Sequence, residues 1–171
     1  MRLYSRNAYD WTPRLAAIAA AAEPIAAKSF TIDAEAVVLG PDGLSRFEEL
    51  PRREAARTAI LYAFDLIEHD GKDLRDLPFL DGKAALAPLL RNTKAGILPN
   101  EHIAEDGVIV FAHACQLGAE GIVSKKVDST YQPGPAASGS KSAIPPASPC
   151  SGSGARYGTA EPPCEGLGRP F

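Results

Sequence analysis

Two acidic residues inside a predicted strand are the first candidates for chemistry. Asp33 and Glu35 lie in the apolar stretch 30–39, where acids are depleted and where burial without a partner is costly. Because side chains alternate along a strand, both carboxylates share one face, opposite Ile32 and Ala34. Carboxylates on one face could contact a ribose hydroxyl or a metal ion. They could equally line the wet face of a half-exposed sheet, which is the more common arrangement.

A charged strand near residue 120 is the strongest single pattern. Glu120 precedes the segment 121–124, and Lys125 and Lys126 follow it. The acid could hold a divalent cation while Lys125 meets a phosphate as a point charge. Because alternate residues face opposite sides, the strand cannot aim both lysines at one site. The plain alternative is an edge strand whose lysines discourage aggregation.

Arg6 and Phe64 could contact a nucleotide from two other places in the chain. Arg6 lies in the polar turn 5–7, from where its guanidinium could fork onto a phosphate or a carboxylate. Most arginines in such turns are simply solvated. Phe64 lies in the apolar stretch 60–67, and an aromatic ring there could stack on a nucleobase. A lone phenylalanine in an apolar strand is more often part of the core.

The segments that must position these residues alternate between strand-like and helix-like patterns. Strands are predicted at 30–39, 60–67 and 122–127, and residues 3–5 are predicted to end a further strand. A helix is predicted at 13–22, with Thr12 as its cap, and a short helix is predicted at the capping box formed by Ser45 and Glu48. Two further helices are predicted at 80–90, where Pro88 could end the helix early, and around 108–115, before Gly118. Turn signals lie at 6–8, 41–43 and 69–71. This order predicts an α+β domain with antiparallel sheets and flanking helices.

The composition limits the class of protein only loosely. The 171 residues are 45% hydrophobic and 23% charged, as is ordinary for a globular domain, and the net charge of -3 neither supports nor excludes DNA binding. No apolar run approaches the roughly 20 residues of a membrane helix, and the first residues lack the apolar core of a signal peptide. The three cysteines show neither close pairing nor metal spacing, which favours the reducing cytosol.

The composition changes near residue 134. Residues 1–134 carry the periodic segments, whereas residues 135–171 are mostly Pro, Gly, Ser and Ala without periodicity. A segment of this kind cannot bury enough surface to offset its ordering entropy, so we expect disorder there. A flexible tail and the end of a frameshifted reading frame would both explain this low-complexity composition.

The order and spacing of these patterns resemble one protein family. The match is to the ATP-dependent DNA ligases, best to the ligase domains of bacterial non-homologous end-joining systems, and it covers residues 2 to about 134. The resemblance implies the nucleotidyltransferase (adenylation) domain of these ligases. The segments that carry it are SRNAYDWT, IDAEAVVLGPDG, YAFDLIEHDGKDLRDLP and ACQLGAEGIVSKKVDSTYQPG.

The resemblance implies a role for each candidate residue. Arg6 corresponds to an arginine near the adenylate and the nicked strand, Glu35 to an acid that contacts the ribose, and Phe64 to the aromatic that stacks on adenine. Glu120 corresponds to the glutamate that helps to place the catalytic metal, and Lys125 to the nucleotide-binding lysine at the end of the same strand. The implied cofactors are ATP and Mg²⁺. The implied partner is nicked or broken duplex DNA, in repair and recombination in the bacterial cytosol or nucleoid, with end-joining proteins as further partners and no membrane.

The chain departs from the family pattern at several points. In the family, the nucleophilic lysine of a Lys-x-Asp-Gly motif attacks the α-phosphate of ATP, and no lysine of this chain is followed by x-Asp-Gly. The expected Trp-x-Lys-x-Lys-like segment and the oligonucleotide-binding barrel are also absent from it. Ala8 and Ala34 stand where the family usually has glycine, which puts the local backbone in doubt. We therefore expect an incomplete adenylation domain that is inactive alone.

Two other functions stay open at this point. The chain could be a non-catalytic ATP- or DNA-binding module, or one half of a split ligase whose partner supplies the missing lysine. An RNA ligase or a capping-type nucleotidyltransferase would belong to the same superfamily. The segments SRNAYDWT and DGKDLRDLP favour the DNA-ligase branch over that last possibility.

Overall fold

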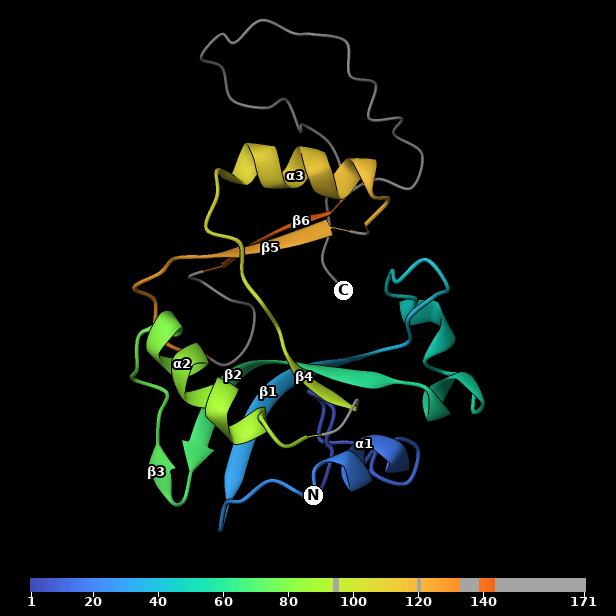
Figure 1. Ribbon diagram of the computed structural model, residues 1–171, viewed down its shortest axis with the longest axis vertical. Coiled ribbons are helices and arrows are strands. Elements are labelled where there is room, and N and C mark those ends of the chain that lie inside the picture. Colours follow the sequence, from blue (N-terminus) through green and yellow to red (C-terminus); the bar gives the residue numbers. More distant parts are fainter. Residues whose placement is uncertain (94–95, 120, 133–138, 144–171) are drawn as a thin grey trace, which may run out of the picture.

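Two sheets and three α-helices make up the part of the chain that the computed structural model describes, residues 1–93, 96–119, 121–132 and 139–143 (Figure 1). The larger sheet holds β1 (Phe30–Val37), β2 (Ile60–His69), β3 (Lys72–Asp73) and β4 (Ile97–Pro99). The smaller sheet pairs β5 (Gly121–Lys125) with β6 (Gly139–Ala143). The helices are α1 (Ala16–Ala21), α2 (Phe79–Leu90) and α3 (Gly107–Gln116), with short 3-10 helices η1 (Phe47–Glu49) and η2 (Ala55–Arg57). The predicted α+β class with antiparallel sheets is confirmed.

The strand β2 is the centre of the larger sheet. It pairs antiparallel with β1 and β3 and parallel with β4, and β1 has no second partner strand within the described ranges. Along β1 the partly buried residues alternate with exposed ones, so Ile32 and Ala34 pack against the core while Asp33 and Glu35 face outward. The predicted alternation is confirmed, and it leaves both carboxylates at the open edge of the sheet.

The strand β2 has a bulge at Phe64. Ala34 lies opposite Ala63 and Asp33 lies opposite Asp65, so Phe64 has no residue opposite it in β1. A bulge of this kind bends a strand and re-aims its side chains. Beyond the bulge β1 and β2 pair again, with Asp65 opposite Asp33 and on the same face of the sheet.

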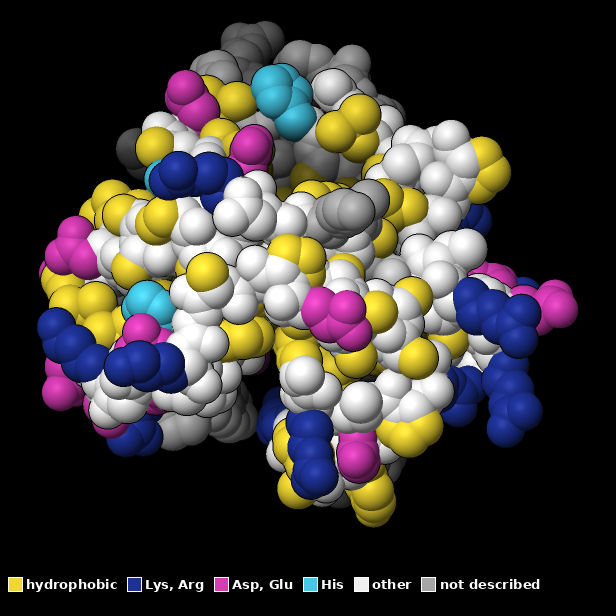
Figure 2. All heavy atoms as spheres, turned by 60° about the horizontal axis from the view of Figure 1, so that its bottom comes forward, with side chains coloured by type: hydrophobic (Ala, Val, Ile, Leu, Met, Phe, Trp, Pro, Cys, Tyr) yellow, Lys and Arg dark blue, Asp and Glu magenta, His cyan; other side chains and the backbone are white. Residues whose placement is uncertain are grey.

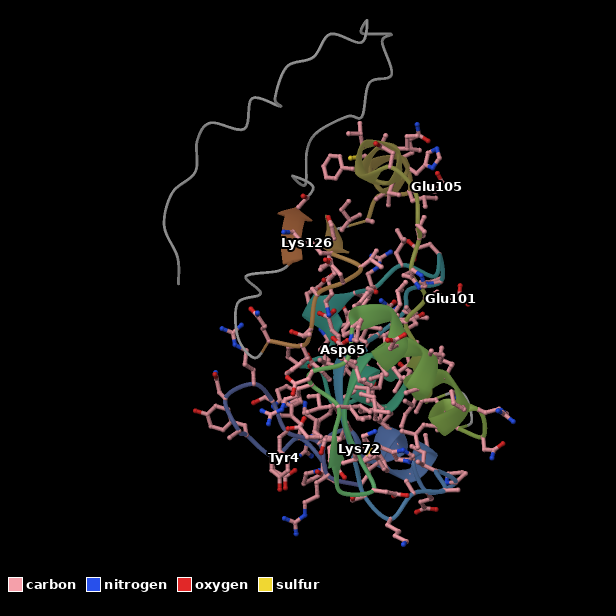
Figure 3. All side chains as sticks on the ribbon, turned by 90° about the vertical axis from the view of Figure 1, so that its left-hand side faces the viewer. Tyr4, Asp65, Lys72, Glu101, Glu105 and Lys126 are labelled. Carbon is pink, nitrogen blue, oxygen red and sulfur yellow. The ribbon has the colours of Figure 1, made fainter. Side chains whose placement is uncertain are left out.

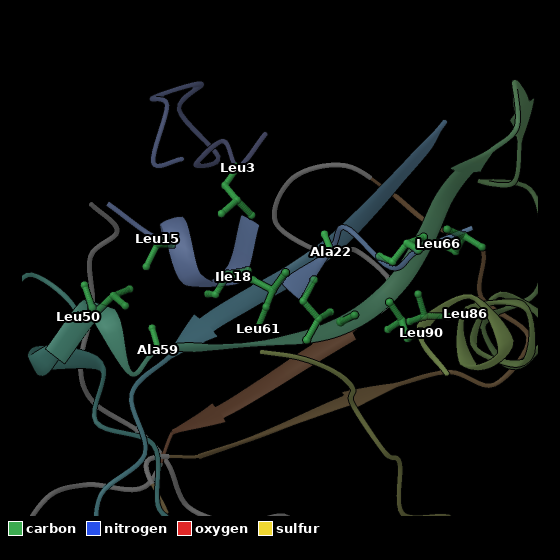
Figure 4. Packing of buried hydrophobic residues seen from close by; sticks show 14 of the residues in the cluster. Leu3, Leu15, Ile18, Ala22, Leu50, Ala59, Leu61, Leu66, Leu86 and Leu90 are labelled. Atoms are coloured by element: carbon green, nitrogen blue, oxygen red, sulfur yellow. The ribbon is translucent and has the colours of Figure 1, made fainter. Parts of the chain in front are cut away.

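The core lies between the larger sheet and the helices α1 and α2 (Figure 4). Full burial of one large aliphatic side chain contributes roughly 1.5–3 kcal/mol to folding, so the fully buried residues dominate this layer. The buried apolar residues are Leu3, Leu15, Ile18, Ala22, Ile25, Val38, Leu50, Ala56, Ala59, Leu61, Ala63, Leu66, Leu74, Leu86, Leu90 and Ile97.

The N-terminal segment differs from its prediction. Residues 3–5 form no strand, because Tyr4 makes only an isolated bridge to Asp10. The helix begins at Ala16 rather than at residue 13, and Thr12 does not cap it. The Thr12 hydroxyl instead accepts a hydrogen bond from the backbone N–H of Leu3 at 2.9 Å. The Thr12 hydroxyl, which local spacing predicted as the helix cap, thus bonds to a residue nine positions away.

Several other elements agree with the sequence in kind but not in extent. The predicted helix 80–90 is α2, and Pro88 lies inside it without ending it. The short helix predicted after Ser45 is present as the three-residue 3-10 helix η1, although Ser45 itself forms a bridge with Leu39. β4 was not predicted, and β6 lies within 135–171, the stretch that composition assigned to a tail. Residues 133–138 and 144–171 lie outside the described part.

The helix α3 lies across the small sheet of β5 and β6 (Figure 1). Asp106 caps its start, because the carboxylate accepts a hydrogen bond from Val108 N at 2.8 Å. Gly118 follows its end with a φ of +72°, the left-handed conformation that glycine adopts without strain. The prediction for this helix and its glycine is confirmed. Among the described residues no helix is long and apolar enough to cross a membrane.

The turn between β2 and β3 is held by charged side chains. Asp70 has a left-handed φ of +51°, and its Oδ1 accepts hydrogen bonds from Lys28 N at 2.7 Å and from Ser29 N at 3.3 Å. These two backbone donors lower the pKa of Asp70. Because the folded-state pKa is lowered, the stabilisation by Asp70 is complete above its unfolded-state pKa of about 3.9 and is lost as the pH falls through the folded-state pKa.

Replacing Asp70 with asparagine is therefore expected to flatten the acid decline of stability. Asparagine tolerates a positive φ and keeps one acceptor oxygen, so the turn remains while the titrating group is removed. Thermal melts between about pH 5 and pH 2 should show a smaller fall in Tm for Asp70→Asn than for the parent chain. The control is Asp128→Asn, since the Asp128 carboxylate accepts no hydrogen bond from any described residue. Equal slopes in both variants would contradict the role of Asp70.

Candidate functional site

A hollow of about 830 Å³ follows the free edge of β1. Its walls come from the N-terminal segment, from the edge of β1 and from the segment after β5. Arg6 and Glu35, which the sequence singled out separately, both line it. The other lining residues are Leu3, Tyr4, Ser5, Trp11, Leu15, Asp33, Ala34, Ala36, Leu50, Leu61, Tyr131 and Gln132.

A tight turn brings Arg6 to this hollow. Ala8 N donates to Ser5 O at 2.8 Å, and Trp11 N donates to Leu3 O at 2.9 Å, so the loop folds back on its own start. Ala8 has a φ of +60°, the left-handed region in which a Cβ atom costs about 1–2 kcal/mol. The expectation that this position suits glycine thus has a structural reason. The predicted turn at 6–8 is confirmed.

A cross-strand pair of carboxylates marks the next part of the site. Asp33 and Asp65 lie opposite each other in β1 and β2, and Asp65 is the one buried charged residue in the described part, with 7% of its surface exposed. Asp33 is exposed over much of its surface, yet partial burial of its carboxyl group and the negative charge of Asp65 raise its pKa. Lys125 and Tyr131 act in the opposite direction and favour the ionised form.

Lys125 compensates the buried carboxylate. Its Nζ donates a hydrogen bond to Asp65 Oδ2 at 2.6 Å and lies 5.0 Å from the centre of the Phe79 ring. Backbone hydrogen bonds hold the segment that follows β5 in place, from Phe79 N to Ser129 O at 2.9 Å and from Tyr131 N to Arg75 O at 3.0 Å. Figure 3 shows Asp65 in the middle of the molecule, below the small sheet, whose strand β5 ends at Lys125.

A second lysine lies over the same aromatic ring, because Phe79 and Lys83 are four residues apart on α2. Lys83 Nζ lies 5.3 Å from the centre of the Phe79 ring and donates a hydrogen bond to Asn100 O. Burial and the positive charge of Lys125 lower the pKa of Lys83, whereas the charge of Asp65 raises it. Two cations therefore share one ring and one buried carboxylate, which is an arrangement suited to an anionic ligand.

Comparison with known proteins gives this site its context. The family described as ATP dependent DNA ligase domain matches residues 1–141. The chain belongs to this family. The ligase domain of LigD from Mycobacterium tuberculosis has a solved structure with a TM-score of 0.72 and 34% identity, over 83% of this chain and 46% of that domain. A mycobacterial DNA ligase D solved with ATP and MES gives a TM-score of 0.68 and 33% identity, over 82% of this chain and 46% of that one.

The curated relatives are longer than this ligase-family chain. A "Multifunctional non-homologous end joining protein LigD" from Pseudomonas aeruginosa is 36% identical over 136 residues, which are 77% of this chain and 16% of that protein. A "Probable DNA ligase" from Streptomyces griseus is 33% identical over 153 residues, which are 78% of this chain and 30% of that protein. The chain thus spans less than a third of either relative.

The ligase-type site residues fall into two adjoining groups. Arg6 and Glu35 line the hollow along β1, while Lys125 contacts Asp65, the cross-strand neighbour of Asp33, and Phe64 precedes Asp65 in β2 without lining the hollow. The two groups meet at the Asp33–Asp65 pair. Glu120, the predicted metal ligand, lies outside the described residues. Figure 3 shows Lys126 beside the small sheet, and Lys126 makes no ion pair with a described residue.

Sequence reasoning did not assign roles to three residues of this candidate site. Asp65 is an acid in an apolar strand, and the argument that singled out Asp33 would have found it too. Tyr131 lies at the hollow, where burial and the charge of Asp33 raise its pKa. Lys83 follows Phe79 by four residues on α2, so helical spacing alone places it over the ring, but a lysine on a helix is usually solvated and nothing in the sequence therefore singled it out.

Proposed function

We propose that this chain supplies the nucleotide-binding face of the adenylation domain of an ATP-dependent DNA ligase that acts in strand joining. The observation that carries the proposal is the hollow at the edge of β1, because Arg6 and Glu35 reach it from segments far apart in the sequence. Family membership supplies the reaction class, which is transfer of AMP from ATP through an enzyme adenylate. The substrate is nicked or broken duplex DNA in bacterial end joining, as the name of LigD suggests for the relatives.

The proposal gives the nucleotide three kinds of contact. Phe64, on the bulge of β2, stacks on the adenine, and an aromatic face suits any nucleobase. Glu35 accepts a hydrogen bond from a ribose hydroxyl, since an ionised carboxylate offers acceptors only. Arg6 and Lys125 face the phosphates, the first as a bidentate fork and the second as a point charge.

A divalent cation fits the same face. Mg²⁺ binds through one or two carboxylates together with substrate phosphates rather than in an all-protein cage. The described residues contain no cluster of three or more His, Cys, Asp or Glu, but they offer the two outward carboxylates Asp33 and Glu35. We propose that Glu120 completes this set. When bound, Mg²⁺ would neutralise the phosphate charge that develops during AMP transfer.

We propose that the nucleophile comes from outside these 171 residues, because none of their lysines stands in a Lys-x-Asp-Gly motif. Nucleophilic catalysis requires a positioned amine, and Lys125 is already engaged with Asp65. The chain by itself is therefore proposed to bind ATP without forming a covalent adenylate.

Replacing Phe64 with alanine is expected to weaken ATP binding about tenfold, because stacking on a base contributes roughly 1–3 kcal/mol. Titration calorimetry with ATP and Mg²⁺ measures this on the full chain. The matched control is Phe111→Ala, which removes a partly buried ring from α3, a helix that packs on the small sheet.

Three outcomes would count against the proposal. They are an unchanged affinity in Phe64→Ala, an equal loss in Phe111→Ala, and no ATP binding by the parent chain. Incubation with α-labelled ATP and Mg²⁺ separately tests the missing nucleophile. A covalently labelled band on a denaturing gel would show that another lysine of this chain accepts AMP.

A further inference from the structure

A second hollow, of about 470 Å³, is lined by arginines from two distant parts of the chain. Arg14 lies just before α1, whereas Arg53 and Arg57 come from the segment around η2. Pro13, Ala16 and Ala17 complete its walls. We call this surface, defined by these six residues, the arginine groove.

The arginines of the groove carry uncompensated charge. Arg14, Arg53 and Arg57 make no ion pair with any described residue, although Glu54 lies beside Arg53 in the sequence. Their neighbour Arg52, in contrast, is paired with Glu49. In a chain of net charge -3, a cluster of unpaired cations on one face points to an anionic ligand.

Figure 2 shows the clustering directly. Basic side chains gather at the right-hand edge of the molecule, where Figure 1 places the segment of η1 and η2. Some acidic side chains lie beside them in this view.

The chemistry of the groove suits a phosphodiester backbone. The Arg14 guanidinium lies 5.2 Å from the centre of the Trp11 ring, a cation–π distance, and because it makes no ion pair with a described residue it can form a forked contact with phosphate. The walls of Pro13, Ala16 and Ala17 present only apolar side chains, which suit sugars and carry no groups that distinguish bases. The groove can thus bind backbone without reading sequence.

The groove adjoins the hollow proposed to hold ATP. Trp11 lines that first hollow, and Arg14, which lies over the Trp11 ring, lines the groove. Leu15 and Leu50 of the first hollow also lie one to three residues from Arg14 and Arg53. A polymer whose end is held at the first hollow could therefore continue along the arginines.

We propose that the arginine groove binds the phosphate backbone of duplex DNA beside the nucleotide site. The inference rests on the proposed function for the identity of the polymer, and it adds the surface along which that polymer lies. Contacts of this kind are electrostatic and depend on salt, because bound arginines release counterions from DNA.

The test compares two double variants that remove the same charge. Fluorescence anisotropy measures binding of a labelled nicked duplex to the full chain, to Arg53→Gln/Arg57→Gln and to Arg46→Gln/Arg52→Gln. The control arginines belong to the same region but are paired, Arg46 with Asp42 at 2.7 Å and Arg52 with Glu49. The groove variant is expected to raise Kd about tenfold and to lower the salt slope by about 2, while the control stays within about twofold of the parent.

Each other result overturns the proposal. Equal weakening in the two double variants would mean that total charge sets the affinity, and an unchanged Kd in the groove variant would place DNA elsewhere. Failure of the parent chain to bind the duplex would also overturn it. Arg53→Lys/Arg57→Lys, which keeps the charge, tests whether any loss comes from unfolding. Normal ATP binding in the groove variant separates this proposal from the proposed nucleotide site.

Discussion

Replacing Leu86 with alanine is expected to lower the free energy of unfolding by about 3 kcal/mol. Leu86 lies on α2 with 1% of its surface exposed, and α2 packs against β2, the central strand of the larger sheet (Figure 4). Alanine would remove apolar area and leave a cavity that the close-packed neighbours fill only in part. Urea denaturation followed by circular dichroism measures the change.

The matched control lies on the same helix. Leu80 has 36% of its surface exposed, so Leu80→Ala should cost less than about 1 kcal/mol. Because both variants change the same residue type in α2, their difference reports burial rather than helix propensity. Equal losses would contradict the packing described for α2. If Leu86→Ala does not fold, Leu86→Met keeps most of the volume and should cost less than about 1.5 kcal/mol.

The elements that rest on local signals could be predicted from the sequence. β1 and β2 were predicted because apolar stretches end in the turn signals at 41–43 and 69–71, and these turns are confirmed. α3 was predicted because its apolar residues have helical spacing before Gly118. In each case the residues that determine the secondary structure lie within one segment, so contacts with distant residues do not change it.

The elements that depend on distant partners could not be predicted. The Thr12 hydroxyl binds Leu3 N instead of capping a helix, a competition that local spacing does not show. β4 has only three residues and exists through its parallel pairing with β2. The bulge at Phe64 likewise depends on how β1 and β2 pair, and residue alternation within one strand contains no sign of it.

The site shows the same division. Order and spacing of motifs predicted Arg6, Glu35, Phe64 and Lys125 through the family resemblance, and the structure places Arg6 and Glu35 at one hollow and Lys125 on Asp65. Their environment was not predictable from those motifs. Asp65 and Lys125 are sixty residues apart in the sequence, and only the fold brings the carboxylate and the ammonium together. The charge balance of the site is therefore a property of the tertiary structure.

Replacing Lys125 with methionine is expected to lower the free energy of unfolding by about 2 kcal/mol and to weaken ATP binding at the same time. The stability loss arises because Asp65, with 7% of its surface exposed, would keep a charge without its cation. The estimate stays below the full cost of breaking a buried pair, since 29% of the Lys125 side chain is exposed and water screens the pair. Lys126→Met, on the opposite face, should change stability by less than about 0.5 kcal/mol.

A double variant separates the structural role of Lys125 from its proposed contact with phosphate. In Lys125→Met/Asp65→Asn neither charge remains, so most of the stability lost in Lys125→Met should return. ATP affinity should stay low in the double variant, because the cation proposed to face the phosphates is still missing. Recovery of both properties would show that Lys125 serves only to neutralise Asp65. Recovery of neither would show that packing against Phe79, rather than the ion pair, is what the lysine contributes.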